Sequence, residues 1–320
     1  MIDNLISRQV EEYITYKKSL GYKIEVEAQE LRRFAAYTVS TGHDGSLSTA
    51  IALRWATLKE TYSRYYMARR IETVRTFAKY ITVFDSKAQI SPKGMFGKCH
   101  GRTTPYIYSK NEIYILMESA LKLHSPDGLR SKTISTAIGL LWTTGMRPNE
   151  LCELMDTDID LDKGLIFIRE TKFSKNRVLP IHKTTVSKLK SYVHLRNKIR
   201  NDFLDSHFFL MTKARQLYLK NFEYAFQVIR KNLLTNMKSW NRRPPRLYDI
   251  RHSFASNTLL SWLKKGINVD NKILYLSVFL GHVKVADTYW YLTGTQELLQ
   301  FVTQNFEKKF YEVEGDLDEK

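Results

Sequence analysis

The chain has 320 residues, of which 43% are hydrophobic, enough for a sizeable core in about two domains. Lys and Arg number 50 against 33 Asp and Glu, and this excess of +17 indicates a polyanionic partner, although a merely basic soluble protein would share it. The sequence contains neither an apolar run of roughly 18 residues for a membrane span nor a signal peptide at its start. We therefore expect a cytoplasmic protein that does not contact membranes.

Residues 1–90 are predicted to form a helical domain, because apolar residues recur there at helical spacing. Basic side chains are interleaved with this pattern, among them Arg69, Arg70 and Arg75. A solvated helix face explains them as well as contact with DNA does, so both interpretations remain open.

Residues 91–106 are rich in Pro, Gly and basic residues and predict a linker between two domains. The pattern then changes to helices mixed with short β-type runs, which predicts a mainly α fold with a small antiparallel β-sheet, an α+β domain over 107–304. Residues 305–320 are acidic and are expected to form a C-terminal tail. The helices expected in the second domain span 112–123, 132–144, 186–196, 222–234, 253–263 and 271–280, and the strands span 159–161, 165–169 and 178–181.

Four short segments carry chemically useful side chains, beginning with T-T-G-M-R-P-N-E-L and E-T-K-F-S-K-N-R-V. In the first, an apolar helix ends at Gly145 and Pro148 suits the first turn of the next helix, so Arg147 is placed at a rigid corner. The second is predicted to be the tip of a basic β-hairpin, with Lys172, Lys175 and then Arg177. Such a tip is often only solvated, but it could also contact a phosphate or a base edge. For Lys175 and Arg177, contact with the DNA backbone and a structural role both remain open.

The third and fourth segments lie nearer the C-terminus. L-Y-D-I-R-H-S-F contains Tyr248 and Arg251, which are three positions apart and share a helix face. L-G-H-V-K-V-A-D-T-Y-W-Y contains His282, Tyr289 and Tyr291, and taken alone its aromatic residues would suit core packing equally well.

Together these residue types are what phosphoryl transfer without a metal requires. Two guanidiniums can hold the non-bridging oxygens as negative charge spreads over them, and a Lys can protonate the leaving 5′-oxygen. A Tyr hydroxyl can attack if neighbouring cations lower the cost of its ionisation. The sequence contains no Walker A loop, no H-E-x-x-H and no carboxylate cluster for two metals. We therefore expect no cofactor and no catalytic metal.

The ordered set resembles the tyrosine recombinase, or phage integrase, family, which includes transposon-borne members. The family pattern places an Arg in T-G-x-R-x-x-E, a Lys in a hairpin, then H-x-x-R-H, L-G-H and a Tyr about nine residues later. In this sequence the resemblance implies Arg147, Lys172, Arg251, His282 and the nucleophile Tyr291. It covers roughly residues 107–304 by motif, and residues 1–90 only by helical character, like the core-binding domain of the family.

The resemblance implies a site-specific recombinase that closes on double-stranded DNA and cuts it through a 3′-phosphotyrosyl bond. Integration, excision and resolution of a mobile element remain open. So do accessory proteins, whereas the partner protomers are expected to form a homotetrameric synapse. One position departs from the pattern, because Tyr248 stands where the family usually has His or Lys, and a phenol is a poor proton acceptor near neutral pH.

Two rival functions share parts of this pattern. A type IB topoisomerase uses the same chemistry, and a non-catalytic DNA-binding regulator could use the same scaffold. A separate helical N-terminal domain and the L-G-H…Y spacing favour a recombinase over a topoisomerase. The complete Arg, Lys, Arg, His and Tyr set argues against a regulator, because DNA binding alone needs no buried Tyr.

Overall fold

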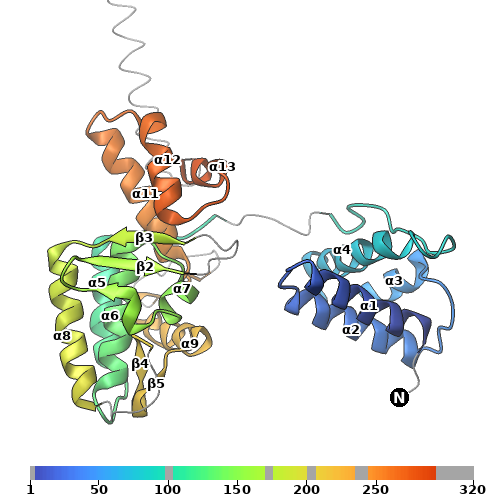
Figure 1. Ribbon diagram of the computed structural model, residues 1–320, viewed down its shortest axis with the longest axis horizontal. Coiled ribbons are helices and arrows are strands. Elements are labelled where there is room, and N and C mark those ends of the chain that lie inside the picture. The colour runs from blue at the N-terminus through green and yellow to red at the C-terminus, as the bar shows by residue number, and fades with distance from the viewer. Residues whose placement is uncertain (1–3, 98–103, 170–175, 200–206, 235–243, 293–320) are drawn as a thin grey trace, which may run out of the picture. The chain divides into compact units, whose positions relative to one another are not determined.

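A computed structural model describes residues 4–97, 104–169, 176–199, 207–234 and 244–292 (Figure 1). The chain divides into two compact units, an N-terminal unit of residues 1–103 and a unit of residues 104–320, which is called the catalytic unit because every residue that the sequence predicts to be catalytic falls in it. None of the described helices has the length and apolar character that crossing a membrane would require.

The N-terminal unit is built from helices around one apolar core. Phe34 and Trp55 meet edge to face at 5.2 Å in this core, and Phe77 contacts Tyr13 at 5.5 Å. Three of the helices have an N-cap residue whose side chain accepts a hydrogen bond from a backbone N–H of the first turn. These N-cap residues are Asn4, Ser48 and Ser63. The helices are α1 (Leu5–Ser19), α2 (Glu25–Ser40), α3 (Thr49–Ala56) and α4 (Arg64–Ile81).

The larger part of the catalytic unit packs helices against a small sheet (Figure 1). The sheet is antiparallel in the order β1-β2-β3, and Ile166 pairs with Leu179 on its buried face. The fold class predicted from the sequence is thus confirmed. The helices are α5 (Lys110–Leu121), α6 (Leu129–Thr144), α7 (Pro148–Cys152), α8 (Lys183–Ile199), α9 (Leu219–Ile229) and α10 (Lys231–Leu234), and the strands are β1 (Ile159–Asp160), β2 (Leu165–Ile168) and β3 (Arg177–Pro180).

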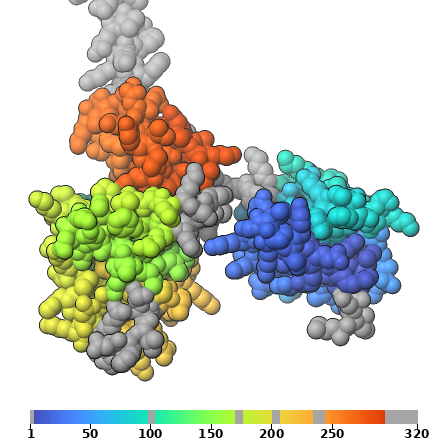
Figure 2. All heavy atoms as spheres, in the orientation of Figure 1, coloured from blue at the N-terminus to red at the C-terminus, as the bar shows by residue number. Residues whose placement is uncertain are grey.

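Three helices at the C-terminal side of this unit form a smaller second core. They are α11 (Asp249–Lys264), α12 (Val269–Leu280) and α13 (Ala286–Tyr289), followed by a 3-10 turn over Trp290–Leu292. This group is orange in Figure 2, and α11 packs against α6. Leu259, Ile273 and Leu276 are buried in its core together with Tyr291. The core therefore holds the last predicted site residue against the rest of the unit.

Two local predictions differ from the structure. The helix expected over 222–234 is two helices, because α9 ends at Ile229 and Arg230 is its C-cap. The Arg230 guanidinium donates to the Pro245 carbonyl. The sequence also failed to predict a two-stranded sheet of β4 (Leu210–Met211) and β5 (Arg215–Gln216). Strands of two residues carry too little periodicity to be recognised.

Candidate active site

Arg147 stands at a tight corner between α6 and α7. Gly145 ends α6 with φ = 60°, in the left-handed region, and a Cβ there would lie 2.3 Å from the Phe254 ring. Arg147 is the N-cap of α7, with Pro148 in the first turn, as the sequence predicts. Its Nη1 donates to Glu150 Oε1 at 2.7 Å and its Nη2 to the Gly281 carbonyl at 3.0 Å. Burial disfavours its charge, but Glu150 outweighs that effect and raises the pKa of Arg147.

Arg251 lies in the first turn of α11 and is only 2% exposed. Its Nη1 donates to the Gly145 carbonyl at 2.8 Å, and its Nη2 donates to the Leu280 carbonyl at 2.7 Å and to His282 Nε2 at 2.9 Å. Burial lowers the pKa of Arg251, and the charge of Arg147 adds to the shift. In the described part of the chain it forms no ion pair with a carboxylate, so its charge is held mainly by neutral groups.

His282 follows α12, which ends at Gly281 with φ = 69°. Burial, Arg251 and Arg147 lower the pKa of His282 to about 4, so the ring is neutral at pH 7. Since Arg251 can only donate, Nε2 must accept, and the ring proton must lie on Nδ1, which donates to Thr288 Oγ1 at 2.7 Å. Both ring nitrogens are therefore occupied in the DNA-free protein.

Tyr291 and Tyr289 have opposite environments. Tyr291 is 4% exposed and its ring stacks on His282, with 5.8 Å between centroids, and packs against His252 at 5.3 Å. Tyr289 is 41% exposed and its hydroxyl donates to Asp270. Burial raises the pKa of Tyr291, and the nearby Arg251 offsets only part of that rise. Arg251 and Arg147 thus favour the ionised form of Tyr291, but by less than burial disfavours it in the DNA-free protein.

Tyr248, the departure from the family pattern, is the N-cap of α11, and its side chain is 41% exposed. Its hydroxyl is close enough to Arg147 to contribute to the raised pKa of that guanidinium. The structure thus brings Arg147, Tyr248, Arg251, His282 and Tyr291 together. Lys172 and Lys175 lie outside the described residues.

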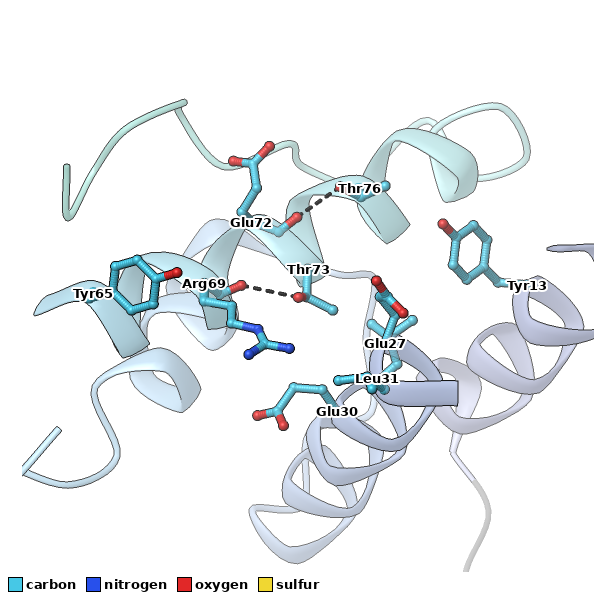
Figure 3. A pocket seen from close by; sticks show the side chains of 10 residues that line it. Tyr13, Glu27, Glu30, Leu31, Tyr65, Arg69, Glu72, Thr73 and Thr76 are labelled. Carbon is cyan, nitrogen blue, oxygen red and sulfur yellow. Dashed lines mark hydrogen bonds between the residues drawn. The ribbon is translucent and has the colours of Figure 1, made fainter. Parts of the chain in front are cut away.

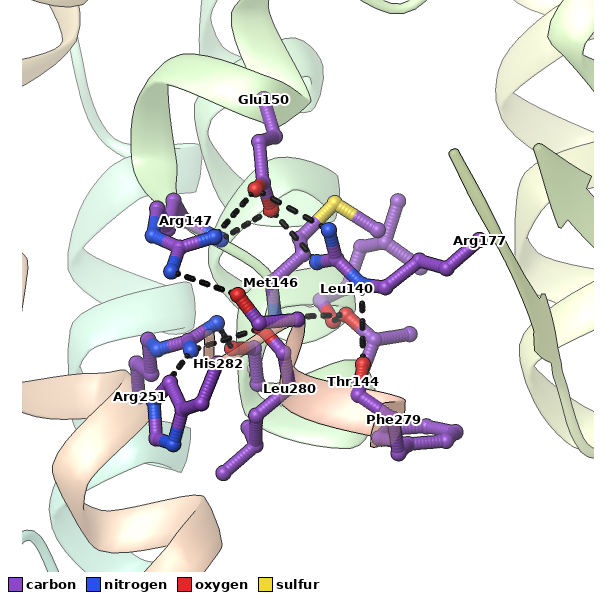
Figure 4. Close-up of polar contacts among 12 residues, drawn as sticks. Leu140, Thr144, Met146, Arg147, Glu150, Arg177, Arg251, Phe279, Leu280 and His282 are labelled. Carbon is purple, nitrogen blue, oxygen red and sulfur yellow. Dashed lines mark hydrogen bonds and ion pairs between the residues drawn. The ribbon is translucent and has the colours of Figure 1, made fainter. Parts of the chain in front are cut away.

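Arg177 is buried in this structure, which favours a structural role over contact with DNA. Its side chain is 6% exposed, and Nη2 and Nη1 bind the Glu150 carboxylate at 2.6 and 3.1 Å while Nε donates to the Phe279 carbonyl (Figure 4). Burial opposes ionisation of Glu150, but Arg177 and Arg147 lower its pKa to about 2. These contacts correspond to the structural role that the sequence left open for Arg177.

The N-terminal arginines differ from one another. Arg70 is buried over the Trp55 ring at 3.8 Å and pairs with Glu30, and Arg75 is bound to Glu72 and the Ser91 carbonyl. The burial of Arg70 favours the structural interpretation over contact with DNA, and two donors of Arg75 are used, Nε by the Ser91 carbonyl and Nη1 by Glu72. Arg69 is exposed and lines a groove of about 320 Å³ (Figure 3). Three glutamates share that groove: Glu27, Glu30 and Glu72.

Comparison with known proteins places this site in a family. Residues 107–297 match the model of the phage integrase family. Over 94% of the chain, the sequence is 32% identical to a putative integrase/recombinase, y4rB, of Sinorhizobium fredii, and the match covers 96% of that protein. The chain belongs to the phage integrase family. This tyrosine recombinase, an enzyme that breaks and rejoins DNA, is also 24% identical to the tyrosine recombinase XerA of Thermococcus kodakarensis, over 93% of each chain.

Solved structures share the fold of this tyrosine recombinase. The integrase of transposon Tn1549, in a complex with transposon right end DNA, superposes with a TM-score of 0.65 at 14% identity, covering 94% of this chain and 98% of that one. The recombinase XerH, bound to its difH substrate after cleavage, gives a TM-score of 0.64 at 18% identity, covering 89% and 80%.

The tyrosine recombinase site also contains residues that the sequence analysis did not assign to it. Glu150 holds two arginines, and Thr288 fixes the tautomer of His282. For Glu150 a signal existed, since a Glu three positions after an N-cap residue predicts a capping box, which the structure has. Thr288 has no comparable local signal.

Proposed function

We propose that this recombinase cuts DNA by attack of the Tyr291 hydroxyl on a phosphodiester held by Arg147 and Arg251. The observation that carries the proposal is the convergence of both guanidiniums, His282 and a buried Tyr291 at the C-terminal end of α12. Arg147 keeps about a quarter of its side chain exposed, and of the five N–H donors of Arg251 three meet the Gly145 and Leu280 carbonyls and His282, which leaves two for the neighbouring Tyr291 hydroxyl and a phosphate. These donors can bind the non-bridging oxygens as charge develops on them.

In the proposed reaction the Tyr291 hydroxyl gives its proton to water as its oxygen bonds to phosphorus, and the bond to the 5′-oxygen breaks, with Lys172 protonating that leaving oxygen. The product is a 3′-phosphotyrosyl bond, which a 5′-hydroxyl of a partner strand attacks in reverse to rejoin the DNA. Tyr248 is exposed beside Arg147 and would donate its hydroxyl proton as a hydrogen bond to a phosphate oxygen. This role needs a donor only, so the change from His or Lys to Tyr does not abolish it.

His282 must change its hydrogen bonds for this chemistry. Its Nε2 accepts from Arg251 in the free protein and so cannot donate to a phosphate. An arriving phosphodiester would draw the Arg251 donors to its own oxygens, and its negative charge would raise the pKa of His282. Protonated on Nε2, His282 could then donate to the same phosphate.

We further propose a specific double-stranded DNA site, a homotetrameric synapse and a cytoplasmic location. The net charge of +17 supports the DNA partner, and the Tn1549 and XerH structures contain those proteins with DNA. The segment after the nucleophile, 296–311, carries apolar residues that we expect to link protomers; it lies outside the described residues. The relatives are recombinases and integrases, which does not favour a topoisomerase. Whether the enzyme integrates, excises or resolves a mobile element, and whether accessory proteins take part, stays open.

The proposal is tested by trapping the covalent intermediate. DNA that stays attached to the protein after denaturation in cells is sequenced to find the site, and a nicked duplex of that site is incubated with each variant. We expect covalent complex from wild type and Tyr289→Phe, and none from Tyr291→Phe. Tyr289 is the matched control because it is an exposed phenol two positions away. Covalent complex formed by Tyr291→Phe would overturn the assignment.

A further inference from the structure

Three consecutive backbone carbonyls at the end of α12 each accept a hydrogen bond from a different arginine (Figure 4). The Phe279 carbonyl accepts from Arg177 at 2.9 Å, the Leu280 carbonyl from Arg251 at 2.7 Å and the Gly281 carbonyl from Arg147 at 3.0 Å. The C-terminal carbonyls of a helix carry partial negative charge, so they suit cations. The end of α12 thereby holds three guanidiniums that would otherwise repel one another.

Only two of these three arginines are proposed to bind the phosphate. Arg177 is 6% exposed, against 26% for Arg147, and all three of its nitrogens are used within the protein. A guanidinium this buried, with each nitrogen already donating to a protein oxygen, is poorly placed to bind a phosphate. Its position in the cluster therefore needs a different explanation.

The explanation lies in how Glu150 is shared. Its Oε2 accepts from Arg177 Nη2 at 2.6 Å and from the Arg147 backbone N–H at 2.9 Å, which leaves the Arg147 guanidinium a single contact with this carboxylate, Nη1 to Oε1. Without Arg177, the buried carboxylate would have one cation to satisfy it, and a bidentate pair with Arg147 would be the favoured geometry. Such a pair would withdraw from the phosphate the donors that Arg147 now keeps free.

Gly281 shows how closely Arg177 is fitted to this place. A Cβ on Gly281 would lie 2.8 Å from Arg177 Nη1, and the backbone there has φ = 69°. The turn that leads to His282 is thus shaped against the Arg177 guanidinium.

We infer that Arg177 is a positioning residue, which acts by occupying Glu150 so that Arg147 stays available to the scissile phosphate. The inference rests on the proposed function, because it requires Arg147 to act on that phosphate. A lysine at position 177 would keep the charge but could not make the same forked contacts. Arg177→Lys should then slow DNA cleavage by about ten- to hundredfold, the usual result of a misplaced catalytic group.

The test is a double-mutant cycle on cleavage of DNA that is already bound. Single-turnover rates are measured at saturating protein, on the nicked duplex, for wild type, Arg177→Lys, Arg147→Ala and the double variant. Arg147→Ala leaves the Arg177–Glu150 pair in place and removes the guanidinium that Arg177 is proposed to keep available. The effect of Arg177→Lys is therefore measured both in wild type and in the Arg147→Ala variant. We expect Arg177→Lys to cost ten- to hundredfold in the wild-type background and less than about threefold in the Arg147→Ala background. An equal loss in both backgrounds would overturn the inference.

Two further variants separate positioning from general stability. Arg196 is the matched control, since it is a 3% exposed arginine of α8 that pairs with Asp156 in the same unit. Arg196→Lys should shift the melting temperature without slowing cleavage of bound DNA. If Arg177→Lys does not fold, Arg177→Gln, which removes both the charge and the fork, is measured in the same two backgrounds, and equal losses in both would overturn the inference.

Tyr291→Phe is run beside these variants. If wild type forms no covalent complex, the proposed function fails. If wild type does form it and Tyr291→Phe does not, a normal cleavage rate for Arg177→Lys refutes the positioning role alone.

Discussion

The two units bury an arginine in two different ways. In the N-terminal unit, Arg70 is 4% exposed, lies 3.8 Å over the Trp55 ring and has the Glu30 carboxylate 3.7 Å away. In the catalytic unit, Arg251 is equally buried but is held by two carbonyls and an imidazole, with no ion pair in the described part of the chain. The first charge is compensated by the fold, and the second is not.

This difference distinguishes a structural arginine from one that awaits a ligand. An uncompensated buried cation is costly, and the lowered pKa of Arg251 records that cost. A phosphodiester supplies the missing negative charge, so the unfavourable free energy of burying the Arg251 charge is offset when DNA binds. A compensated arginine such as Arg70 gains nothing from a phosphate.

The largest expected effect follows from Arg251. Replacing it with Lys should slow cleavage of bound DNA by about 30- to 1,000-fold, a loss of about 2–4 kcal/mol of transition-state stabilisation. Affinity for the duplex should change much less, because other cations contact the phosphates. Single-turnover cleavage and a binding titration are measured on the same duplex. Loss of affinity together with a normal rate in the bound state would show that Arg251 only binds.

Arg70 should give the opposite result. Arg70→Met removes the cation from the Trp55 ring and leaves Glu30 without it, so we expect about 1–3 kcal/mol lower free energy of unfolding. The cleavage rate of bound DNA should stay within about twofold of wild type. Urea denaturation followed by Trp fluorescence measures the first quantity. Normal stability with weakened DNA binding would mean that Arg70 leaves its pocket to contact DNA.

The uncompensated charge should also appear in the pH dependence of stability. The pKa of His282 is about 4 in the folded protein, against an ordinary value near 6.5. Between these pH values the unfolded chain binds a proton that the folded chain does not, so stability is lost as pH falls from 6.5 to 4. His282→Gln should reduce the difference between urea midpoints at pH 7 and pH 5, whereas Gln at the exposed His194 should not. An unchanged difference in His282→Gln would contradict the lowered pKa.

The smallest effect is expected at Arg69. This side chain is exposed, so we propose it as a phosphate contact, and Arg69→Gln should weaken DNA binding a few-fold. The slope of log affinity against log salt should fall by about one, as for a single lost phosphate contact. If affinity and slope are both unchanged, the guanidinium serves the groove glutamates of Figure 3 instead.

Local rules explain why part of the site could be predicted. The corner at Arg147 follows from a Gly that ends one helix and a Pro that begins the next, both readable within four residues. Tyr289 and Tyr291 are two positions apart, so their side chains face different sides of the helical segment. This spacing accounts for the exposure of Tyr289 and the burial of Tyr291. The position of Arg70 was also readable, since it stands four residues before the buried Val74 and seven before the buried Phe77, on the core face of α4.

The contacts that the sequence could not predict join distant segments. Arg177 and Glu150 are 27 positions apart on a strand and a helix, and nothing in either segment indicates that they pair. Likewise, the neutral tautomer of His282 depends on Arg251, 31 positions away. Such pairs are set by how the elements pack, which periodicity and capping rules do not determine.

The separation of these partners along the chain has a consequence for biosynthesis. Arg147 needs the carbonyl of Gly281, which is 134 positions later and is synthesised on the order of ten seconds after it. Tyr291 follows later still, and its ring packs only against helices from the last part of the described chain. A nascent chain on the ribosome therefore has no assembled site until Tyr291 has left the ribosome. Released fragments and stalled chains should be unable to nick the chromosome.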